Sequence, residues 1–310
     1  MAFRSGFVSI IGRPNTGKST LLNALVGEKL AIVTRKPQTT RNRILGIVNV
    51  ERKAGQPGGQ VVLIDTPGVH KPINSLNRRM MKEVYDALEG CNLLLLIADA
   101  TAKFGPSDQY VLDLAKKSGL PIFLLLNKVD AIDKQKLLPL IAQYKELNDF
   151  AEVIPISALK REGLDTLLAL IIKVLPEGPR YFPQDQITDQ PERFLVAELI
   201  REQVLMNTSQ EVPHATTVLI DRYEEGDKLT SIAATIYVER PGQKSILIGK
   251  QGATVKKIGT AARLQIERLL NMRVFLELFV KVHPNWRESR RFVEETDWRR
   301  QLEKMGGISE

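Results

Sequence analysis

The sequence predicts an α/β domain with a doubly wound, mostly parallel sheet, followed by a smaller α+β domain. Over residues 1–175, short apolar runs alternate with stretches of helical period, which is typical of a parallel sheet covered by helices. Residues 176–191 hold four prolines and show no period, as expected of a linker. Beyond the linker the alternation stops, so we expect a second domain over 192–285 and a tail over 286–310.

Each element of the first domain is predicted from its own residues. Runs rich in Val, Ile and Leu predict strands at 7–11, 44–50, 60–64, 93–98, 122–126 and 152–155. Apolar residues at helical spacing predict helices near 18–27, 76–88, 107–118, 134–147 and 163–175. The glycine-rich stretch 54–59 separates two strand-like runs and indicates a hairpin loop, so we expect one antiparallel edge strand.

The second domain is expected to contain helix, strand, strand, helix, helix and strand, in that order. The corresponding ranges are 192–206, 215–223, 229–239, 243–248, 252–270 and 274–282. An acidic turn joins the first two strands. The tail predicts a charged helix over 286–304, which carries Trp286 and Trp298.

The composition favours a protein of the reducing cytoplasm. The chain has one cysteine and three histidines, which excludes an internal disulfide and disfavours a zinc site. It has no run of 18 apolar residues and no basic-then-apolar leader, so we expect neither a membrane span nor a secretory signal. Cys91 precedes an apolar run and is expected to be a core thiol.

The net charge of +8 is unevenly distributed along the chain. Residues 1–180 carry a balance of +8, residues 181–239 a balance of −7, and residues 240–304 a balance of +8. Such sorting can build one basic face, the usual footprint of a nucleic-acid binder. A solvated surface of mixed charge would give the same totals, so the charge alone leaves both interpretations open.

A phosphate-binding motif follows the first predicted strand. Two glycines separated by four residues, then Lys and Ser, form a loop whose backbone N–H groups cradle nucleotide phosphates. Lys18 can reach the β- and γ-phosphates, and the Ser19 hydroxyl can ligate Mg²⁺. The residues expected to contact a nucleoside triphosphate are Gly12, Arg13, Pro14, Asn15, Thr16, Gly17, Lys18, Ser19 and Thr20.

A second phosphate-facing motif, Asp65-Thr66-Pro67-Gly68, follows the predicted strand 60–64, and its residues are expected to contact the nucleotide together with Val69. Asp65 can hold a magnesium-bound water, and the N–H of Gly68 can contact the γ-phosphate. A Thr in the loop before strand 44–50 can complete the magnesium shell. Thr40 is preferred there, and Thr39 is the alternative. These loops, 35–43 and 68–82, are the expected switches.

Two further motifs indicate the base. Asn127-Lys128-Val129-Asp130 follows strand 122–126, and the Asp130 carboxylate can accept from the N1–H and the exocyclic amine of guanine. Asn127 can tie this loop to the phosphate loop, and the stem of Lys128 can cover the base. In Ser157-Ala158-Leu159, the N–H of Ala158 can donate to guanine O6. Four motifs in this order predict a P-loop GTPase that uses GTP and Mg²⁺.

The catalytic set predicted is Lys18, Thr40, Asp65 and Gly68. Val69 stands where many GTPases place the Gln that orients the attacking water, so we expect slow hydrolysis. His70 is a weak substitute for that Gln. Asn15 can help instead by ligating K⁺ beside the phosphates, or it only shapes the turn.

Gly249-Lys250-Gln251-Gly252 lies between two predicted helices. The surrounding order of elements matches a type II KH module, in which this turn brings backbone N–H groups to the phosphates of single-stranded RNA. The residues expected to contact RNA are Ile246, Ile248, Gly249, Lys250, Gln251, Gly252, Val255, Lys256, Lys257 and Ile258. The alternative is a glycine turn that only joins two helices.

Together these motifs resemble the Era family of bacterial GTPases. The likeness covers nearly the whole chain and is carried by Asp-Thr-Pro-Gly-Val-His, Arg-Lys-Pro-Gln-Thr-Thr-Arg and Ile-Leu-Ile-Gly-Lys-Gln-Gly. The resemblance implies a ribosome-assembly factor that binds the 3′ end of small-subunit ribosomal RNA on the small ribosomal subunit. It also implies a cytoplasmic protein with some peripheral association at the inner face of the cell membrane, and K⁺ near Asn15. We expect a monomer, and the role of loop 54–59 stays open.

Two other classes of function fit parts of the sequence. A membrane-associated regulatory GTPase would use its C-terminal domain to recruit a protein or a lipid. An RNA-binding module with vestigial hydrolysis would bind RNA regardless of the nucleotide. The context of the Gly-x-x-Gly turn disfavours the first class, and the intact nucleotide motifs disfavour the second.

Overall fold

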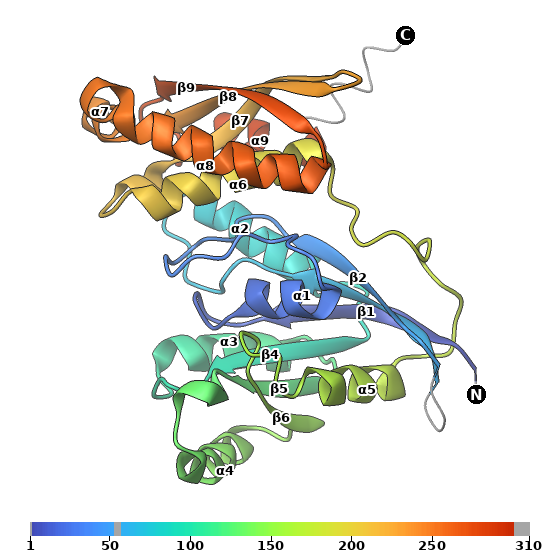
Figure 1. Ribbon diagram of the computed structural model, residues 1–310. Helices are drawn as coiled ribbons and strands as arrows, with labels where there is room; N and C mark the ends of the chain where they lie inside the picture. Colours follow the sequence, from blue (N-terminus) through green and yellow to red (C-terminus); the bar gives the residue numbers. More distant parts are fainter. Residues whose placement is uncertain (1, 53–56, 301–310) are drawn as a thin grey trace. The chain divides into compact units, whose positions relative to one another are not determined.

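The computed structural model describes residues 2–52 and 57–300, and they form two compact units (Figure 1). The first unit comprises the chain up to Ala31, Thr40–Lys71 and Met80–Asp189. The second comprises Ile32–Thr39, Pro72–Arg79 and the chain from Gln190 onward. Two short segments of the N-terminal half therefore belong to the second unit, which the sequence did not indicate.

A six-stranded sheet forms the centre of the first unit. Its strands are β1 (Arg4–Ile11), β2 (Ile44–Val50), β3 (Gly59–Asp65), β4 (Leu93–Asp99), β5 (Ile122–Asn127) and β6 (Glu152–Ile156). The order across the sheet is β2-β3-β1-β4-β5-β6, and every neighbouring pair is parallel except β2 with β3. The predicted antiparallel edge strand is thus confirmed. Part of the predicted hairpin loop, residues 54–56, lies outside the described residues.

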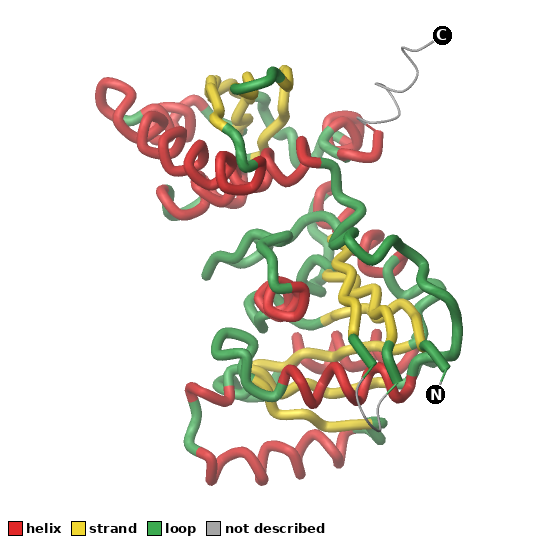
Figure 2. Tube along the Cα trace, turned by 45° about the vertical axis from the view of Figure 1, so that its right-hand side comes forward, coloured by secondary structure: helices red, strands yellow, loops and turns green. Residues whose placement is uncertain are grey.

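Helices cover both faces of this sheet (Figure 2). They are α1 (Lys18–Val26), α2 (Ser75–Asp86), α3 (Pro106–Lys117), α4 (Leu137–Leu147) and α5 (Leu164–Val174). Leu94 and Leu96 of β4 share one core with residues of α2, α3 and α4. Because side chains alternate along a strand, Leu93 and Leu95 face the other side, where they are equally buried. Helices α1 and α5 pack against β1, β2 and β3.

Helix ends follow local rules of sequence. Gly27 caps α1 with a φ of 90°, a backbone conformation that only glycine adopts without strain. Pro106 opens α3, and the carboxylate of Asp108 accepts from the N–H of Gly105 at 2.9 Å. Short 3₁₀ turns occur at Val129–Ala131 and Lys134–Lys136, so the helix predicted from 134 begins as a tighter turn.

The second unit is a three-stranded sheet with helices packed on it. Its helices are α6 (Glu192–Asn207), α7 (Pro241–Ile248), α8 (Ala253–Leu270) and α9 (Arg290–Glu295), and its strands are β7 (Thr217–Glu225), β8 (Leu229–Val238) and β9 (Arg273–Val282). Strand β8 is central, antiparallel to β7 and parallel to β9. Residues of α6, α7, α8 and the three strands form one apolar core. Further 3₁₀ turns lie at Val212–Ala215 and Lys250–Gly252.

The predicted tail helix over 286–304 is wrong in extent. Turns occupy 284–288, α9 ends at Glu295, and residues 301–304 lie outside the described part of the chain. Trp286 lies in these turns, where its ring is fully buried and its indole N–H donates to the Ala215 carbonyl at 2.7 Å. Residues 298–300 are helical again, so the predicted helix is present in two separate pieces of the described chain.

Cys91 is a core thiol, as predicted. It is 7% exposed, and its thiol donates to the carbonyl of Ala87 at 3.0 Å. Burial raises the pKa of Cys91 to about 11. Over residues 2–52 and 57–300, no helix is long and apolar enough to cross a membrane.

Candidate nucleotide and RNA sites

The strand register brings the nucleotide motifs to one edge of the first sheet. Ile10 of β1 pairs with Asp65 of β3, and Asn127 of β5 pairs with Asp99 of β4. Because these strands are parallel, the loops after them leave the sheet on the same side. The sheet therefore assembles motifs that lie more than 100 residues apart in sequence.

The lysine of the phosphate loop binds backbone carbonyls of the same loop. Lys18 is 6% exposed, and its ammonium donates to the carbonyls of Gly12 at 3.2 Å and Arg13 at 2.8 Å. Burial lowers the pKa of Lys18 to about 8, although the nearby charge of Asp65 opposes this shift. Gly17 has a φ of 100°, and a Cβ there would collide with the side chain of Asn127. Glycine is required at this position for both reasons.

Three oxygen atoms suited to a magnesium ion meet next to this loop. The Ser19 hydroxyl donates to Asp65 Oδ2 at 2.6 Å and lies 2.7 Å from the Thr40 hydroxyl. Burial raises the pKa of Asp65 to about 6, against the opposing effects of Lys18 and of hydrogen bonds that include Ser19. Within the described residues, Asp65 Oδ1 is buried and has no hydrogen-bond partner. A buried carboxylate with an unsatisfied oxygen and two hydroxyls is a donor set that fits Mg²⁺.

The alternative magnesium residue, Thr39, is engaged elsewhere. Its hydroxyl lies 2.7 Å from the Thr34 hydroxyl and donates to the Lys36 carbonyl at 2.7 Å. The side chain of Thr40 is the one that approaches Ser19 and Asp65. The geometry therefore favours Thr40.

The loop after β3 runs close against the phosphate loop. A Cβ on Gly68 would lie 2.8 Å from the backbone of Pro14, so only glycine allows this approach. Val69 is 1% exposed, packs in the core, and donates its N–H to the Gly12 carbonyl at 3.0 Å. The side chain of Val69, which was predicted as a nucleotide contact, therefore packs in the core instead. His70 Nδ1 contacts the Gly68 carbonyl at 2.6 Å.

Asn127 links the base-binding loops to the phosphate loop, as predicted. Its amide N–H donates to the Thr16 carbonyl at 2.8 Å, and its carbonyl oxygen accepts from the N–H of Ala158 at 2.9 Å. If Ala158 also donates to guanine O6, as predicted, its N–H must be shared between that oxygen and Asn127 Oδ1. Asp130 is exposed beside this link, in the 3₁₀ turn Val129–Ala131. Of the third loop, Ser157 is buried and Leu159 is 73% exposed.

Two carboxylates support the site from residues that the motifs do not include. Asp99 at the end of β4 binds the Lys128 ammonium at 2.5 Å, and that ammonium also donates to the Asn15 carbonyl at 2.8 Å. Asp108 of α3 binds Arg13 Nε at 2.6 Å and is 8% exposed. Burial alone would raise the pKa of Asp99, but hydrogen bonds from Lys128 and Thr101 outweigh it and lower that pKa. The position of Asp99 at a strand end was the one available signal.

The Gly-x-x-Gly turn has the backbone that the motif requires. Gly249 and Gly252 have φ angles of 72° and 78°, and Gln251 between them has a φ of 52°. Lys250 and Gln251 are exposed at the tip of the turn. These conformations turn the chain sharply between α7 and α8 and leave both polar side chains outward.

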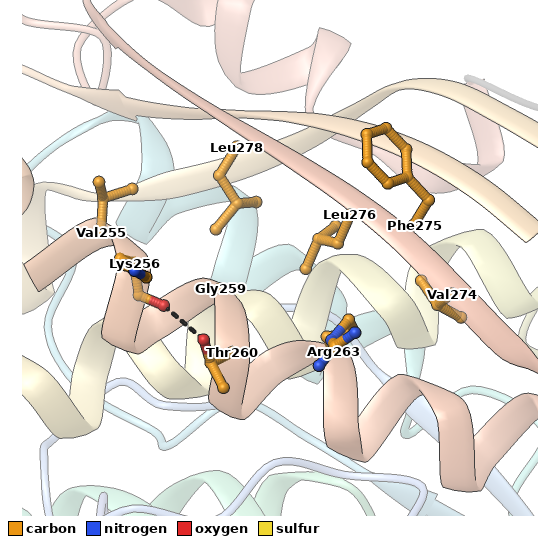
Figure 3. Close-up of a pocket in the computed structure, with 9 residues that line it drawn as sticks. All are labelled: Val255, Lys256, Gly259, Thr260, Arg263, Val274, Phe275, Leu276 and Leu278. Atoms are coloured by element: carbon orange, nitrogen blue, oxygen red, sulfur yellow. Dashed lines mark hydrogen bonds between the residues drawn. The ribbon is translucent and has the colours of Figure 1, made fainter. Parts of the chain in front are cut away.

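A groove of about 390 Å³ lies between α8 and β9 (Figure 3). Leu276 and Leu278 point from the strand toward the helix, whereas the ring of Phe275 points away from it. The lining residues are Val255, Lys256, Gly259, Thr260, Arg263, Val274, Phe275, Leu276 and Leu278. Of these, the sequence predicted only Val255 and Lys256 for RNA binding. Apart from Phe275, the others follow a helical stripe on α8 and the alternation of β9, which could have indicated them.

One residue predicted to contact RNA is buried, and three others lie outside the groove. Ile258 is 0% exposed and packs in the core of the second unit, so it cannot contact RNA. Its spacing on α8 points it at the sheet. Ile246 is 47% exposed on α7, but Ile246, Ile248 and Lys257 do not line the groove.

Two protein families match the chain. A family described as "50S ribosome-binding GTPase" matches residues 7–128, and the KH domain family matches residues 211–287. These matches agree with the nucleotide motifs of the first unit and with the Gly-x-x-Gly turn of the second.

Similarity to curated proteins extends over almost the whole chain. The chain is 52% identical to GTPase Era of Geobacter metallireducens over 295 residues, covering 94% of this chain and 97% of that protein. It is 48% identical to GTPase Era of Syntrophus aciditrophicus, covering 94% of each.

Solved structures give the same result. A variant of Aquifex aeolicus Era bound to GDP and AlF4⁻ matches with a TM-score of 0.89 and 39% identity. Era in complex with MgGDPNP and nucleotides 1506–1542 of 16S ribosomal RNA matches with a TM-score of 0.90 and 39% identity. Each match covers 94% of this chain and 98% of the other. With this identity over nearly its full length, the chain belongs to the Era family of GTPases.

Proposed function

We propose that this GTPase is a switch that binds single-stranded RNA from the 3′ end of small-subunit ribosomal RNA and assists maturation of that subunit. The observation that carries the proposal is that one chain holds a guanine-nucleotide site and an exposed Gly-x-x-Gly turn beside a groove. The Era structure with 16S ribosomal RNA nucleotides supports this RNA class. The "50S" description belongs to a family that matches residues 7–128 only, so it carries less weight.

In the proposed nucleotide site, the chain's residues divide the work by position. Lys18 leaves the loop carbonyls and pairs with the β- and γ-phosphates, while Asn127 keeps the base loops in register with the phosphate loop. Ser19 and Thr40 would hold Mg²⁺ directly, and Asp65 would hold it through water. Bound Mg²⁺ supplies charge neutralisation at the β- and γ-phosphates.

Two features of the site make slow hydrolysis the expected behaviour. Val69 is turned into the core, so no side chain at that position orients a water. Asn15, whose φ is 65°, is the residue we propose for K⁺ binding near the phosphates. A rate that rises with K⁺ but not with Na⁺ would support this role.

For RNA, the proposed contacts begin at the turn and continue along the groove. Backbone N–H groups at 249–252 and the lysines Lys250 and Lys256 would meet phosphates, and the apolar groove residues would lie beneath unstacked bases. We further propose that the protein acts as a cytoplasmic monomer with peripheral association at the inner face of the membrane. Co-sedimentation with anionic vesicles, with and without RNA, measures the membrane part.

The experiment that tests this function compares RNA binding and hydrolysis in one variant. Combined Lys250→Asp and Gln251→Asp substitution places negative charge at the tip of the turn, so RNA affinity should fall at least tenfold by phosphate repulsion. Basal GTP hydrolysis should stay within about twofold of the parent rate. Lys228→Asp, on the exposed β7–β8 turn, is the control for added negative charge elsewhere on this unit, and it should change neither RNA affinity nor hydrolysis.

The probe is a single-stranded oligonucleotide from the 3′ end of small-subunit ribosomal RNA, with a scrambled oligonucleotide beside it. Unchanged RNA affinity in the double variant would contradict the proposed RNA site. Equal binding of both oligonucleotides and of anionic vesicles would contradict the RNA function itself.

A further inference from the structure

The boundary between the two compact units falls inside the switch loop that precedes β2. Ile32–Thr39, called here the 32–39 segment, belongs to the second unit, whereas Thr40 belongs to the first. A peptide bond joins Thr39 to Thr40, and the six atoms around such a bond lie in one plane. A group that holds the Thr39 carbonyl therefore sets the direction in which the backbone enters Thr40.

Within the second unit, Arg201 of α6 holds that carbonyl. Its Nη2 donates to the Thr39 oxygen, and it also binds Glu198 Oε2 at 2.6 Å, while Nε binds Glu198 Oε1 at 2.7 Å. Arg201 is 2% exposed, and among the described residues its Nη1 has no hydrogen-bond partner. Glu198 thus fixes the plane of the guanidinium and aims one N–H at the backbone beside Thr40.

The rest of the 32–39 segment is held by the same part of the second unit. The carboxylate of Glu202 on α6 accepts from the N–H of Val33 at 3.1 Å. The Lys36 ammonium donates to the carbonyl of Thr208, the residue that follows α6. Residues of the second unit therefore bind the segment near its start, its middle and its end, and Arg201 binds its last residue, Thr39.

Stability alone does not account for a buried ion pair at this position. Replacing a buried Arg–Glu pair with apolar residues of similar volume is often neutral or stabilising. What the pair does provide is a rigid, directional donor. The oxygen it holds is one residue from the Thr40 hydroxyl, which lies 2.7 Å from Ser19 Oγ.

We propose that Arg201, oriented by Glu198, is a positioning residue for Thr40, and that it acts through the peptide bond that joins Thr39 to Thr40. The inference rests on the proposed function, in which Thr40 ligates Mg²⁺ when GTP is bound. Arg201 holds the Thr39–Thr40 peptide so that the Thr40 hydroxyl is presented to the ion. Because linkage is reciprocal, any RNA effect on α6 that shifts Arg201 also shifts the preference for GTP over GDP.

The test measures nucleotide preference in Arg201→Gln. The readout is the ratio of affinities for Mg²⁺ with the non-hydrolysable analogue GMPPNP and for GDP, since Thr40 engages only the first. Loss of one charge-assisted hydrogen bond should lower this ratio about tenfold, with GDP affinity unchanged. Arg201→Lys keeps a charge without the planar fork and should restore part of the ratio. The same variant should lose most of the difference in RNA affinity between the two nucleotide states.

Two further variants keep the test decisive. Lys36 is half-buried, and Lys36→Met removes only its hydrogen bond to the Thr208 carbonyl. This exchange should lower the ratio of GMPPNP to GDP affinity less than Arg201→Gln does. Arg193→Gln makes the same exchange on α6, where the guanidinium bonds the Ile220 carbonyl on β7, and should leave the ratio unchanged. If Arg201→Gln fails to fold, Lys36→Met carries the measurement.

The outcomes separate this inference from the proposed function. A parental ratio in a folded Arg201→Gln protein, or an equal loss of affinity for both nucleotides, would overturn the positioning role, provided that Thr40→Ala lowers the ratio. If Arg201→Gln does not fold, a parental ratio in Lys36→Met would overturn it. A parental ratio in Thr40→Ala would instead contradict the magnesium role of Thr40 in the proposed function.

Discussion

At the scale of single residues, the nucleotide site works because buried polar groups are held in fixed directions. The side-chain amide of Asn127 donates to the Thr16 carbonyl at 2.8 Å and accepts from the N–H of Ala158 at 2.9 Å, so it joins the two loops. It is 3% exposed, so neither bond competes with bulk water. Asp130 beside it is exposed and is left to bind the base.

The role of Asp130 predicts a change of base preference. In Asp130→Asn, one acceptor becomes an NH₂ donor, which faces the exocyclic amine of guanine and leaves both groups unpaired. GTP affinity should fall by about 100-fold or more, while xanthosine triphosphate, with a carbonyl at that position, should bind better than GTP. Competition between the two nucleotides measures this preference.

Asp133→Asn is the matched control for that exchange. Asp133 is exposed, pairs with Lys136 at 3.0 Å on the surface, and should not affect base preference. An Asp130→Asn protein that still prefers GTP would contradict the assignment of the base contact.

The motif residues could be predicted from the sequence because each motif carries its chemistry within a few neighbouring positions. Asp99 and Asp108 could not, since they act on Lys128 and Arg13 from other elements of the fold. Ile258 was misplaced for a related reason. Ile258 lies three positions from the lining residue Val255, and a residue at that spacing on a helix can face either the groove or the core, so only packing decides between them.

At the scale of elements, local pattern was a good guide where the hydrophobic period was strong. The strands predicted at 44–50 and 122–126 appear as Ile44–Val50 and Ile122–Asn127. The extent of the tail helix was predicted poorly, because the charge pattern along residues 286–304 does not reveal that Trp286 is buried and donates to the Ala215 carbonyl. Tertiary burial overrode the local preference for a continuous helix.

The groove between α8 and β9 predicts a role for an arginine outside the Gly-x-x-Gly turn. Arg263 is exposed and lines this groove, so Arg263→Gln should weaken RNA binding by about threefold to tenfold. The slope of the logarithm of RNA affinity against the logarithm of salt concentration should become shallower by about one. The measurement is RNA affinity at several salt concentrations.

Arg268→Gln provides the comparison on the same helix. Arg268 is also exposed on α8 but does not line the groove, so the exchange should have little effect. Equal effects of the two substitutions would show that only net charge matters, and that RNA does not follow the groove.

At the scale of the whole molecule, the two units share the chain in an unexpected way. The boundary between them crosses the switch loop between Thr39 and Thr40 and crosses α2 between Arg79 and Met80. Leu76 donates its N–H to the Arg287 carbonyl at 3.0 Å within the second unit, in a segment that precedes Met80 by a few residues. No local pattern predicts this division, because it depends on which distant residues each segment contacts.

This division gives the switch account its physical basis. Both loops that respond to the γ-phosphate in the proposed function have residues in each unit. In the proposed function, a conformational change in either loop would involve backbone of both units, and coupling of this kind acts in both directions. The central claim is therefore that the bound nucleotide sets the affinity for RNA.

The measurement that tests this claim most directly is the affinity for a single-stranded oligonucleotide from the 3′ end of small-subunit ribosomal RNA, taken with GMPPNP and Mg²⁺ and again with GDP. Salt is held fixed because phosphate contacts depend on it. If the two sites are coupled, binding is about tenfold tighter with GMPPNP, within the usual range of coupling between two sites. Equal affinity in the two nucleotide states would show that the sites are not coupled.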